Sequence, residues 1–453
     1  MNAMTKKKIS DEGKKYLSGL AWGTLRQRLI RGVSWNIVGT VLGQGSVFAT
    51  SILVANRLGP QLFGEFSLLQ NTALTLSAIA QVATGTTATR YVAQYRVSDP
   101  ARAGRILGFC TLLTLITGLI GFTFVIAFSD WLSEETLRAP HLATGLKIMA
   151  LYLLISAMAG FQTGALAGLE AYRRIATVGA LHSIFHVGMT AIGVWFYGLP
   201  GALWALVGSL ILRWGMFHHA IRQETRRAGI RIAYVLGKEE QRVLFRFSLP
   251  AALAGLTAMP ALWLANTFLV QHSDGYRQLG LYSAAMSLKA AVMLLPIAVN
   301  SVGGAIINSH LGPNDQSRYR EAYWLNVVAT TSIALFGALV VISFSDFLLS
   351  FFGKEFLDAQ SALVILLVSA VPEALAIALY QVIQTREKMW WSLIAVSIPR
   401  DGLIVVAAYY LAREIGAPGV SMAYLFGWIV ALTVISVKVH RIGIKSVVSS
   451  NFT

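Results

Sequence analysis

Long apolar runs follow one another along most of the chain. A membrane-spanning helix needs about 20 apolar residues, and the sequence offers about twelve runs of this length. They lie at approximately 33–55, 65–86, 105–128, 145–168, 175–196, 200–220, 248–270, 279–305, 322–344, 360–384, 390–411 and 418–437. Only 13% of the residues are charged, against roughly 25% in soluble domains. The pattern predicts an all-α polytopic membrane protein with about twelve transmembrane helices.

The chain also repeats itself. Two motif pairs share their glycine positions: NRLGPQLFGEFS (56–67) with QLGLYS (278–283), and YGLPGALWA (197–205) with IGAPGVSMA (415–423). In the first pair, Gly64 matches Gly280. Both pairs recur at an offset of roughly 217 residues, close to half of the chain, which indicates a duplicated unit.

The duplication predicts the arrangement of the spans. An even number of spans per repeat makes both halves enter the membrane in the same direction, related by an axis along the membrane normal. We therefore expect two pseudo-symmetric six-helix lobes with a central cleft between them. The expected segments are a basic cytoplasmic tail with an amphipathic helix (1–31), an N-lobe (32–221), a cytoplasmic linker (222–246), a C-lobe (247–440) and a cytoplasmic tail (441–453).

The basic residues favour one orientation. The net charge is +16, and with the N-terminus inside, most of the 37 Lys and Arg residues fall in segments on the cytoplasmic side. The positive-inside rule then places both termini in the cytoplasm. The segment YLSGLAWGTLRQRLIR (16–31) is typical of an amphipathic helix on an anionic membrane surface, and a solvated basic tail is the alternative. Because the basic residues are expected at the membrane surface, their expected partners are membrane lipids. No nucleic acid partner is expected.

Four stretches resemble the polysaccharide transporter or oligosaccharide flippase family. They are ILVANRLGPQLFGEFSLLQ (52–70), GTTATRYVAQYR (85–96), FRFSLPAALAGL (245–256) and QLGLYSAAMSLKAAVMLLPIAV (278–299). The resemblance runs through both halves, and the family belongs to the superfamily of multidrug and toxin extrusion proteins and the lipid II flippase. One departure is NSVGGAIINSHLG (300–312), where related proteins often show a Pro-Ser pattern.

The resemblance implies a function and a location. A member of this family flips an undecaprenyl-diphosphate-linked oligosaccharide from the cytoplasmic to the outer leaflet of a bacterial plasma (inner) membrane by alternating access, for surface polysaccharide assembly. A polysaccharide polymerase and glycosyltransferases are the implied partner proteins. The family is not one of enzymes.

Basic residues at the spans form the expected substrate site. A charge near the bilayer centre costs roughly 2.5–3.5 kcal/mol, so such residues are functional candidates by default. Arg213, Lys289 and Arg400 lie within spans, and Arg90 lies at the cytoplasmic end of the second one. Arginine binds phosphate oxygens bidentately and lysine acts as a point charge, so we expect these residues to line a positive cleft for the diphosphate. Helix packing, snorkelling of Arg213 to the surface and an ordinary interfacial place for Arg90 are the alternatives.

Three acidic residues are candidates for coupling transport to an ion gradient: Glu65, Glu373 and Asp401. Glu373 is expected within reach of Lys289 or Arg400, because an unpaired carboxylate in hydrocarbon is unstable. Asp401 follows Arg400 at about 100° round the helix, so the two are expected to face different surfaces. No GxxxxGK[ST] phosphate loop is present, and neither a cofactor nor ATP hydrolysis by this chain is expected.

Polar residues complete the expected site. His186 shares a helical face with His182, but no third ligand stands at a recognisable spacing, so a polar cavity wall or interhelical hydrogen bonding is favoured over a metal site. Gln44 and Gln81 belong to polar stripes on the first two spans. Such stripes either line a hydrated cleft that contacts sugar hydroxyls or bond neighbouring helices.

Three other functions are alternatives to the flippase. An ion-coupled small-molecule or drug exporter of the same superfamily calls for acidic groups, whereas the intramembrane charges are mainly basic. A major-facilitator transporter shows a GxxxD[RK]xG[RK] loop after its second span, which YVAQYRVSDPARAGR (91–105) does not supply. A membrane-embedded polysaccharide polymerase or ligase calls for a large outer loop, whereas the expected outer loops are short.

Overall fold

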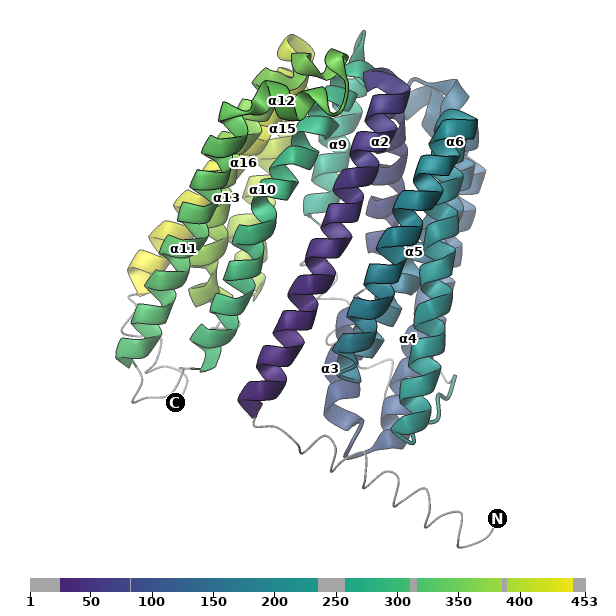
Figure 1. The fold of residues 1–453 in the computed structure, drawn as a ribbon, viewed down its shortest axis with the longest axis vertical. Helices are drawn as coiled ribbons and strands as arrows, with labels where there is room; N and C mark the ends of the chain where they lie inside the picture. The colour runs from purple at the N-terminus through teal and green to yellow at the C-terminus, as the bar shows by residue number, and fades with distance from the viewer. Residues whose placement is uncertain (1–24, 82, 235–256, 310–315, 385–388, 443–453) are drawn as a thin grey trace, which may run out of the picture.

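The computed structural model describes residues 25–81, 83–234, 257–309, 316–384 and 389–442 (Figure 1). Within these ranges the chain is helical and contains no strand. The main helices are α2 (Leu25–Gln81), α3 (Thr84–Tyr95), α4 (Pro100–Trp131), α5 (Ala143–Gly168), α6 (Tyr172–Arg227), α9 (Ala258–Val270), α10 (Gly275–Ser309), α11 (Gln316–Ser343), α12 (Ser345–Ser350), α13 (Gln360–Gln384), α14 (Met389–Ser392), α15 (Ile398–Ile415) and α16 (Ala417–Ile442). Most of the expected N-terminal amphipathic helix lies outside the described residues.

Two of these helices cross the bundle twice. Helix α2 turns back at Gly59, with φ 75° and ψ 173°, followed by Pro60, and α6 turns back at Gly198, two residues before Pro200. Glycine tolerates positive φ, and proline lacks the N–H that would continue the helix, so both sequences favour a sharp turn. Within the described ranges, eight helical segments are long and apolar enough to span a membrane. With the second limb of α6, both limbs of α2 and the described part of α9, the twelve predicted spans are accounted for.

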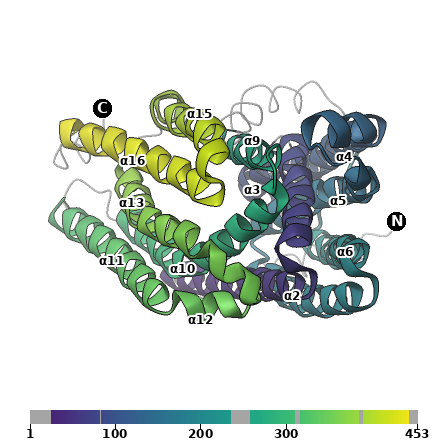
Figure 2. The same ribbon diagram turned by 90° about the horizontal axis from the view of Figure 1, so that it is seen from above.

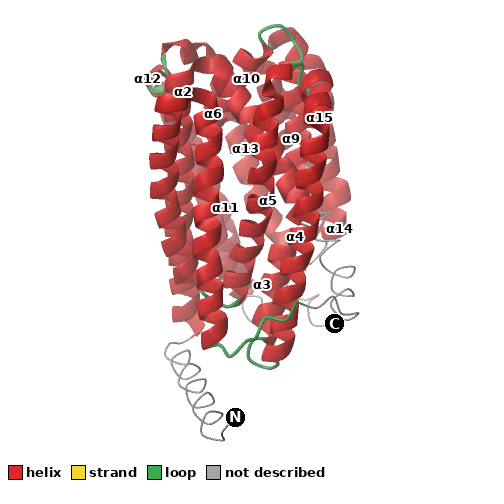
Figure 3. Ribbon diagram, turned by 90° about the vertical axis from the view of Figure 1, so that its right-hand side faces the viewer, coloured by secondary structure: helices red, strands yellow, loops and turns green. Residues whose placement is uncertain are grey.

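The helices form a bundle with two recognisable ends. We call the end at which α2 begins and α16 ends the basal end, and the end that holds the turns at Gly59, Gly198 and Gly416 the apical end. The helices run between these ends side by side (Figure 3). Viewed along the bundle, α11, α13 and α16 lie on one side and α4, α5 and α6 on the other (Figure 2). This arrangement confirms the prediction of two helical lobes.

The repeated glycine–proline motif forms the same turn in both lobes. Gly198 adopts φ 60° and ψ −137°, and Gly416 adopts φ 63° and ψ −133°. The second glycine of each motif, Gly201 and Gly419, lies so close to the preceding limb that an added Cβ would stand 2.0 and 2.1 Å from a backbone carbonyl oxygen. The sequence repeat is therefore a repeat of backbone geometry.

The two lobes touch backbone to backbone at the other repeated glycine. A Cβ added to Gly64 would stand 1.9 Å from the carbonyl oxygen of Tyr276, and one added to Gly280 would stand 1.8 Å from that of Pro60. The glycine of each lobe thus lies against the equivalent backbone segment of the other lobe. Small residues permit such close approach of membrane helices, so the Gly64–Gly280 contact is a point of closest approach between the lobes.

The hydrophobic core is shared by the lobes only towards the apical end. There, Phe63 of the N-lobe packs edge-on against Phe356 of the C-lobe, with ring centroids 6.0 Å apart, inside one cluster drawn from both lobes. Towards the basal end, the described residues form separate clusters, one around Phe161 in the N-lobe and one around Tyr323 in the C-lobe. The lobes are therefore joined apically and pack independently at the base.

Replacement of Gly64 by valine is expected to disrupt the inter-lobe contact, because the new side chain collides with a backbone that cannot move aside. Overpacking typically costs about 1–3 kcal/mol, so the thermal unfolding midpoint of the purified protein should fall. Gly45→Val on the same helix is the matched control, since a Cβ there meets nothing within 4 Å. Equal destabilisation by both substitutions would contradict the interface.

Reporter fusions test the span count and the orientation. A fusion after Phe344, at the apical end of α11, and one after Gln384, where α13 ends, should report opposite sides of the membrane. From the distribution of basic residues we expect the Gln384 fusion on the cytoplasmic side. Two fusions reporting the same side would contradict the assignment of α13 as one span.

Candidate functional site

A polar cavity lies inside the N-lobe, between α2, α5 and the two limbs of α6. Its volume is about 380 Å³. The polar side chains that line it are Thr40, Gln44, Ser46, Gln70, Tyr152, Tyr172, His182, Ser183, His186, Ser209 and Arg213. Three of the predicted site residues, Gln44, His186 and Arg213, are thus brought together from different spans. This cavity is the candidate substrate site.

Arg213 supplies the positive charge of the cavity. It projects from the second limb of α6, and its guanidinium lies over the ring of Phe217 at 5.2 Å. Among the described residues, its Nε donor is buried and makes no hydrogen bond. The side chain therefore lines the cavity instead of snorkelling to the surface, and its guanidinium gives the cavity wall a positive charge.

His186 ties the wall of the cavity together. One ring nitrogen lies 3.3 Å from the hydroxyl of Thr50 on α2, and the other lies 3.2 Å from that of Ser209 on the second limb of α6. The ring stacks on His182, with centroids 5.5 Å apart. Both nitrogens are engaged by hydroxyl groups, so His186 acts here as an interhelical hydrogen-bonding group within a polar wall.

The C-lobe holds its charges in a buried network. The ammonium of Lys289 pairs with the carboxylate of Glu373 and donates to the hydroxyl of Tyr424 at 2.9 Å. The Tyr424 hydroxyl in turn donates to Glu373 at 3.0 Å. Both charged residues are buried, at 4% and 8% exposure. The prediction that Glu373 reaches Lys289 or Arg400 is confirmed, and the partner is Lys289.

Arg400 pairs with Asp401, which the helical geometry had placed on a different surface. The guanidinium donates to the two carboxylate oxygens at 2.7 and 3.1 Å, so that expectation was wrong. The angle between successive positions fixes where a side chain leaves the helix, but the long arginine arm bends back to its neighbour. Arg400 also lies over the ring of Trp428 at 4.8 Å. Trp428 contacts Tyr424, which links this pair to the Lys289–Glu373 pair.

The three other predicted residues lie apart from both groups. Gln81 packs inside the N-lobe against Gly160, where an added Cβ would stand 1.8 Å from the glutamine amide nitrogen. Arg90 is exposed near the basal end of α3, with its guanidinium 5.7 Å from the Tyr91 ring centroid. Glu65 is buried beside the Gly64 contact and lies 3.1 Å from a ring nitrogen of His141.

Some residues of these sites were not predicted from the sequence. Gln70 lines the cavity and carries a visible signal, because it belongs to the polar stripe of the second span. Tyr152, Tyr424 and Trp428 carry none, since an aromatic residue in an apolar run is indistinguishable from a packing residue until its neighbours are known.

Comparison with known proteins identifies the family. The profile of the family described as polysaccharide biosynthesis protein matches residues 29–307, which is more than half of the chain. The chain belongs to this family. The match covers the whole N-lobe, including the cavity around Arg213, and it confirms the resemblance to polysaccharide transporters seen in the sequence.

Curated relatives point the same way. The chain is 24% identical over 398 residues to the EPS I polysaccharide export inner membrane protein EpsE of Ralstonia nicotianae, covering 84% of this chain and 87% of the relative. It is also 24% identical over 386 residues to EpsE of Ralstonia solanacearum. Family and relatives support a membrane transporter of polysaccharide biosynthesis and export.

Solved structures show the same fold. An inward-facing multidrug resistance MATE family transporter of the MOP superfamily matches with a TM-score of 0.72 and 18% identity, over 91% of this chain and 96% of that one. An outward-facing MATE family transporter matches with a TM-score of 0.68 and 19% identity, over 95% and 98% of the two chains. The predicted all-α fold with two lobes is thereby confirmed.

The Lys289–Glu373 pair is expected to behave as one unit. Lys289→Met leaves a buried carboxylate without its cation and should destabilise the protein by about 3–5 kcal/mol. The double variant Lys289→Met, Glu373→Leu removes both charges and should recover most of that loss. Thermal unfolding of the purified variants measures both effects. A double variant less stable than either single one would show that the two side chains do not act as a pair.

Proposed function

We propose that this transporter flips an undecaprenyl-diphosphate-linked oligosaccharide across the plasma membrane of a bacterium. The observation that carries the proposal is the cavity around Arg213, where a half-buried cation with no acidic residue among the lining residues stands among amide and hydroxyl groups. The family, and relatives named for polysaccharide export in the inner membrane, support the same class of substrate.

The cavity offers two kinds of contact. Arg213 binds phosphate oxygens through its planar guanidinium. Gln44, Gln70 and Tyr152 donate and accept hydrogen bonds, as sugar hydroxyls require. A buried cation is unfavourable in hydrocarbon unless it is paired, so an entering diphosphate neutralises Arg213. The polyprenyl chain stays in lipid, where its burial costs nothing further.

The C-lobe cations take a different part in this proposal. Lys289 and Arg400 are neutralised by Glu373 and Asp401 in this conformation. Glu373 and Asp401 are therefore the proposed ion-coupling groups, because protonation of either carboxylate frees a cation for the substrate. Arg90, exposed near the basal end, is the proposed first contact for an incoming head group.

Alternating access requires the lobes to part at one end and close at the other. The shared apical core and the separate basal cores support a state that is closed apically. If the basic basal end faces the cytoplasm, as the charge distribution predicts, this state is inward-facing. Transport then requires separation at the Gly64–Gly280 contact, and buried Glu65 beside it is a further candidate for ion coupling.

Ion-coupled drug export is the second candidate, because the fold is shared with multidrug transporters. An organic cation requires an accessible acidic group, whereas the buried carboxylates Glu373 and Asp401 are each occupied by a basic side chain. The residues that line the N-lobe cavity include the cation Arg213 and two histidines, and no acidic residue is among them. These charges favour an anionic substrate.

Substitution of Arg213 tests the proposal. In cells without the wild-type copy, Arg213→Lys should keep part of the surface polysaccharide, Arg213→Ala should keep less and Arg213→Glu should abolish it. The order follows because a charged hydrogen bond is worth about 1.5–3 kcal/mol, and a carboxylate repels phosphate. Surface polysaccharide is quantified together with the amount of each variant in the membrane.

The matched control is Arg441→Glu, which reverses the charge of an exposed arginine at the end of α16. It should leave surface polysaccharide unchanged. Normal polysaccharide from well-expressed Arg213→Glu would exclude the cavity as the diphosphate site. Unchanged polysaccharide combined with new sensitivity to organic cations would favour drug export.

A further inference from the structure

A second depression lies on the other face of the α6 hairpin, outside the polar cavity. Its volume is about 610 Å³, and it is formed between the two limbs of α6. Its walls are largely apolar, with exposed Leu181 on the first limb and exposed Ile211 and Leu212 on the second. Trp214 and Gly215 complete the middle of the groove. In a membrane-spanning hairpin, this face meets lipid.

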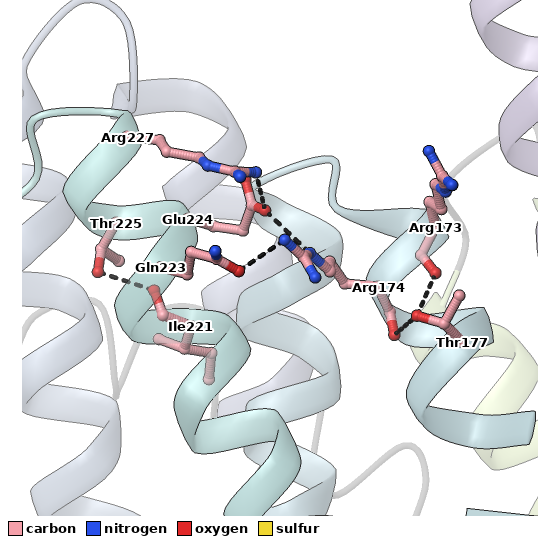
Figure 4. Close-up of polar contacts among 8 residues, drawn as sticks. All are labelled: Arg173, Arg174, Thr177, Ile221, Gln223, Glu224, Thr225 and Arg227. Carbon is pink, nitrogen blue, oxygen red and sulfur yellow. Dashed lines mark hydrogen bonds and ion pairs between the residues drawn. The ribbon is translucent and has the colours of Figure 1, made fainter. Parts of the chain in front are cut away.

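The basal mouth of the groove is basic. Arg174 and Thr177 line the groove on the first limb, and Arg173 lies one helical turn nearer the basal end than Thr177, whose hydroxyl donates to the Arg173 carbonyl at 2.9 Å (Figure 4). On the second limb, Gly215 and His219 line the groove, and Arg222 continues their helical face. Both Arg173 and Arg222 are exposed. Exposed arginines therefore lie on both limbs at the basal end of the apolar groove, close to the lining residue Arg174.

Neighbouring acidic side chains do not neutralise these two arginines. Glu224 is shared by Arg174, at 3.4 Å, and Arg227, at 3.1 Å, and Arg174 also donates to the amide oxygen of Gln223 at 2.6 Å (Figure 4). Among the ion pairs found in the described part of the chain, none involves Arg173 or Arg222. Within the described part of the chain, the mouth of the groove keeps a net positive charge.

We propose that this groove binds an anionic phospholipid. Its phosphate and headgroup are held by Arg173 and Arg222, and its acyl chains lie along Leu181, Ile211 and Trp214. Charge complementarity carries the choice, since basic pockets between membrane helices on the cytoplasmic side select anionic headgroups. A zwitterionic lipid fills the apolar part equally well but brings no net charge to the arginines.

The groove is separate from the proposed substrate site. Arg213 belongs to the polar cavity, whereas its neighbours Leu212 and Trp214 belong to the groove, so the two sites use different faces of one helix. A polyprenyl chain whose diphosphate is held by Arg213 is not positioned in the groove. Lipid binding is thus a property beyond the proposed transport function and is measured without it.

Native mass spectrometry of the full-length protein tests the proposal. Delipidated protein is titrated with phosphatidylglycerol or with phosphatidylcholine of the same acyl chains, and the lipid-bound fraction is compared. Phosphatidylglycerol should bind more tightly to the wild type. Arg173→Gln with Arg222→Gln should lower the preference roughly 10- to 30-fold. These arginines are exposed and form no ion pair with the described residues, so the fold should persist.

A second variant blocks the apolar part. Gly215→Leu places a side chain in the groove, where an added Cβ meets no atom within 4 Å, and it should reduce binding of both lipids. Gly188→Leu is the matched control, because it lies on the same hairpin, has equally open surroundings and does not line the groove. It should bind lipid as the wild type does. Thermal unfolding midpoints verify that all variants remain folded.

Four results would overturn the proposal. The first is equal binding of the two lipids by the wild type, the second is an unchanged preference in the double arginine variant, and the third is unchanged binding by Gly215→Leu. The fourth is that undecaprenyl diphosphate displaces the lipid from the wild type but not from Gly215→Leu, which would assign the groove to the substrate chain. Failure of Arg213 variants to affect surface polysaccharide bears on the transport proposal alone.

Discussion

The structure depends on a contact that involves almost no side chain. At Gly64 and Gly280 the two lobes meet through their backbones, each glycine set against a carbonyl of the other lobe. In a bilayer, helices gain little from burying apolar side chains against one another, because lipid is equally apolar, so close backbone approach and dispersion contacts become more important. The shared core towards the apical end is built around this contact, and towards the base the lobes have cores of their own. A joint at one end with independent packing at the other is what a two-lobed transporter needs for movement.

The lobes repeat each other in backbone but not in charge. Their glycine–proline turns have nearly the same dihedral angles, whereas their buried polar groups differ. The N-lobe cavity contains Arg213 without an acidic partner among its lining residues. The C-lobe contains two ion pairs connected through Tyr424 and Trp428, which together carry no net charge. The duplicated scaffold thus presents a cavity with a positive charge in one lobe and a neutral network of paired charges in the other, a difference that agrees with the proposed anionic substrate.

The α6 hairpin illustrates how one element serves two environments. Its inner face carries Arg213 and His186 into the polar cavity, and its outer face presents the apolar groove with arginines at its mouth. Because successive positions of a helix point in different directions, the residues of one face do not belong to the other. The proposed lipid site and the proposed substrate site therefore use neighbouring positions of one helix.

The sequence by itself determined the spans, the duplication and the turns, because hydrophobicity over about 20 residues and the backbone preferences of glycine and proline are local properties. It also determined that Glu373 needs a cation, since a carboxylate in hydrocarbon demands one. Only the tertiary structure decided that Lys289 is that cation, that Arg400 turns back to Asp401, and that Gln44, His186 and Arg213 share a cavity while Gln81, Arg90 and Glu65 lie elsewhere. These outcomes depend on how each helix is rotated and on how far a long side chain reaches, and both are set by packing against helices that are distant in the sequence.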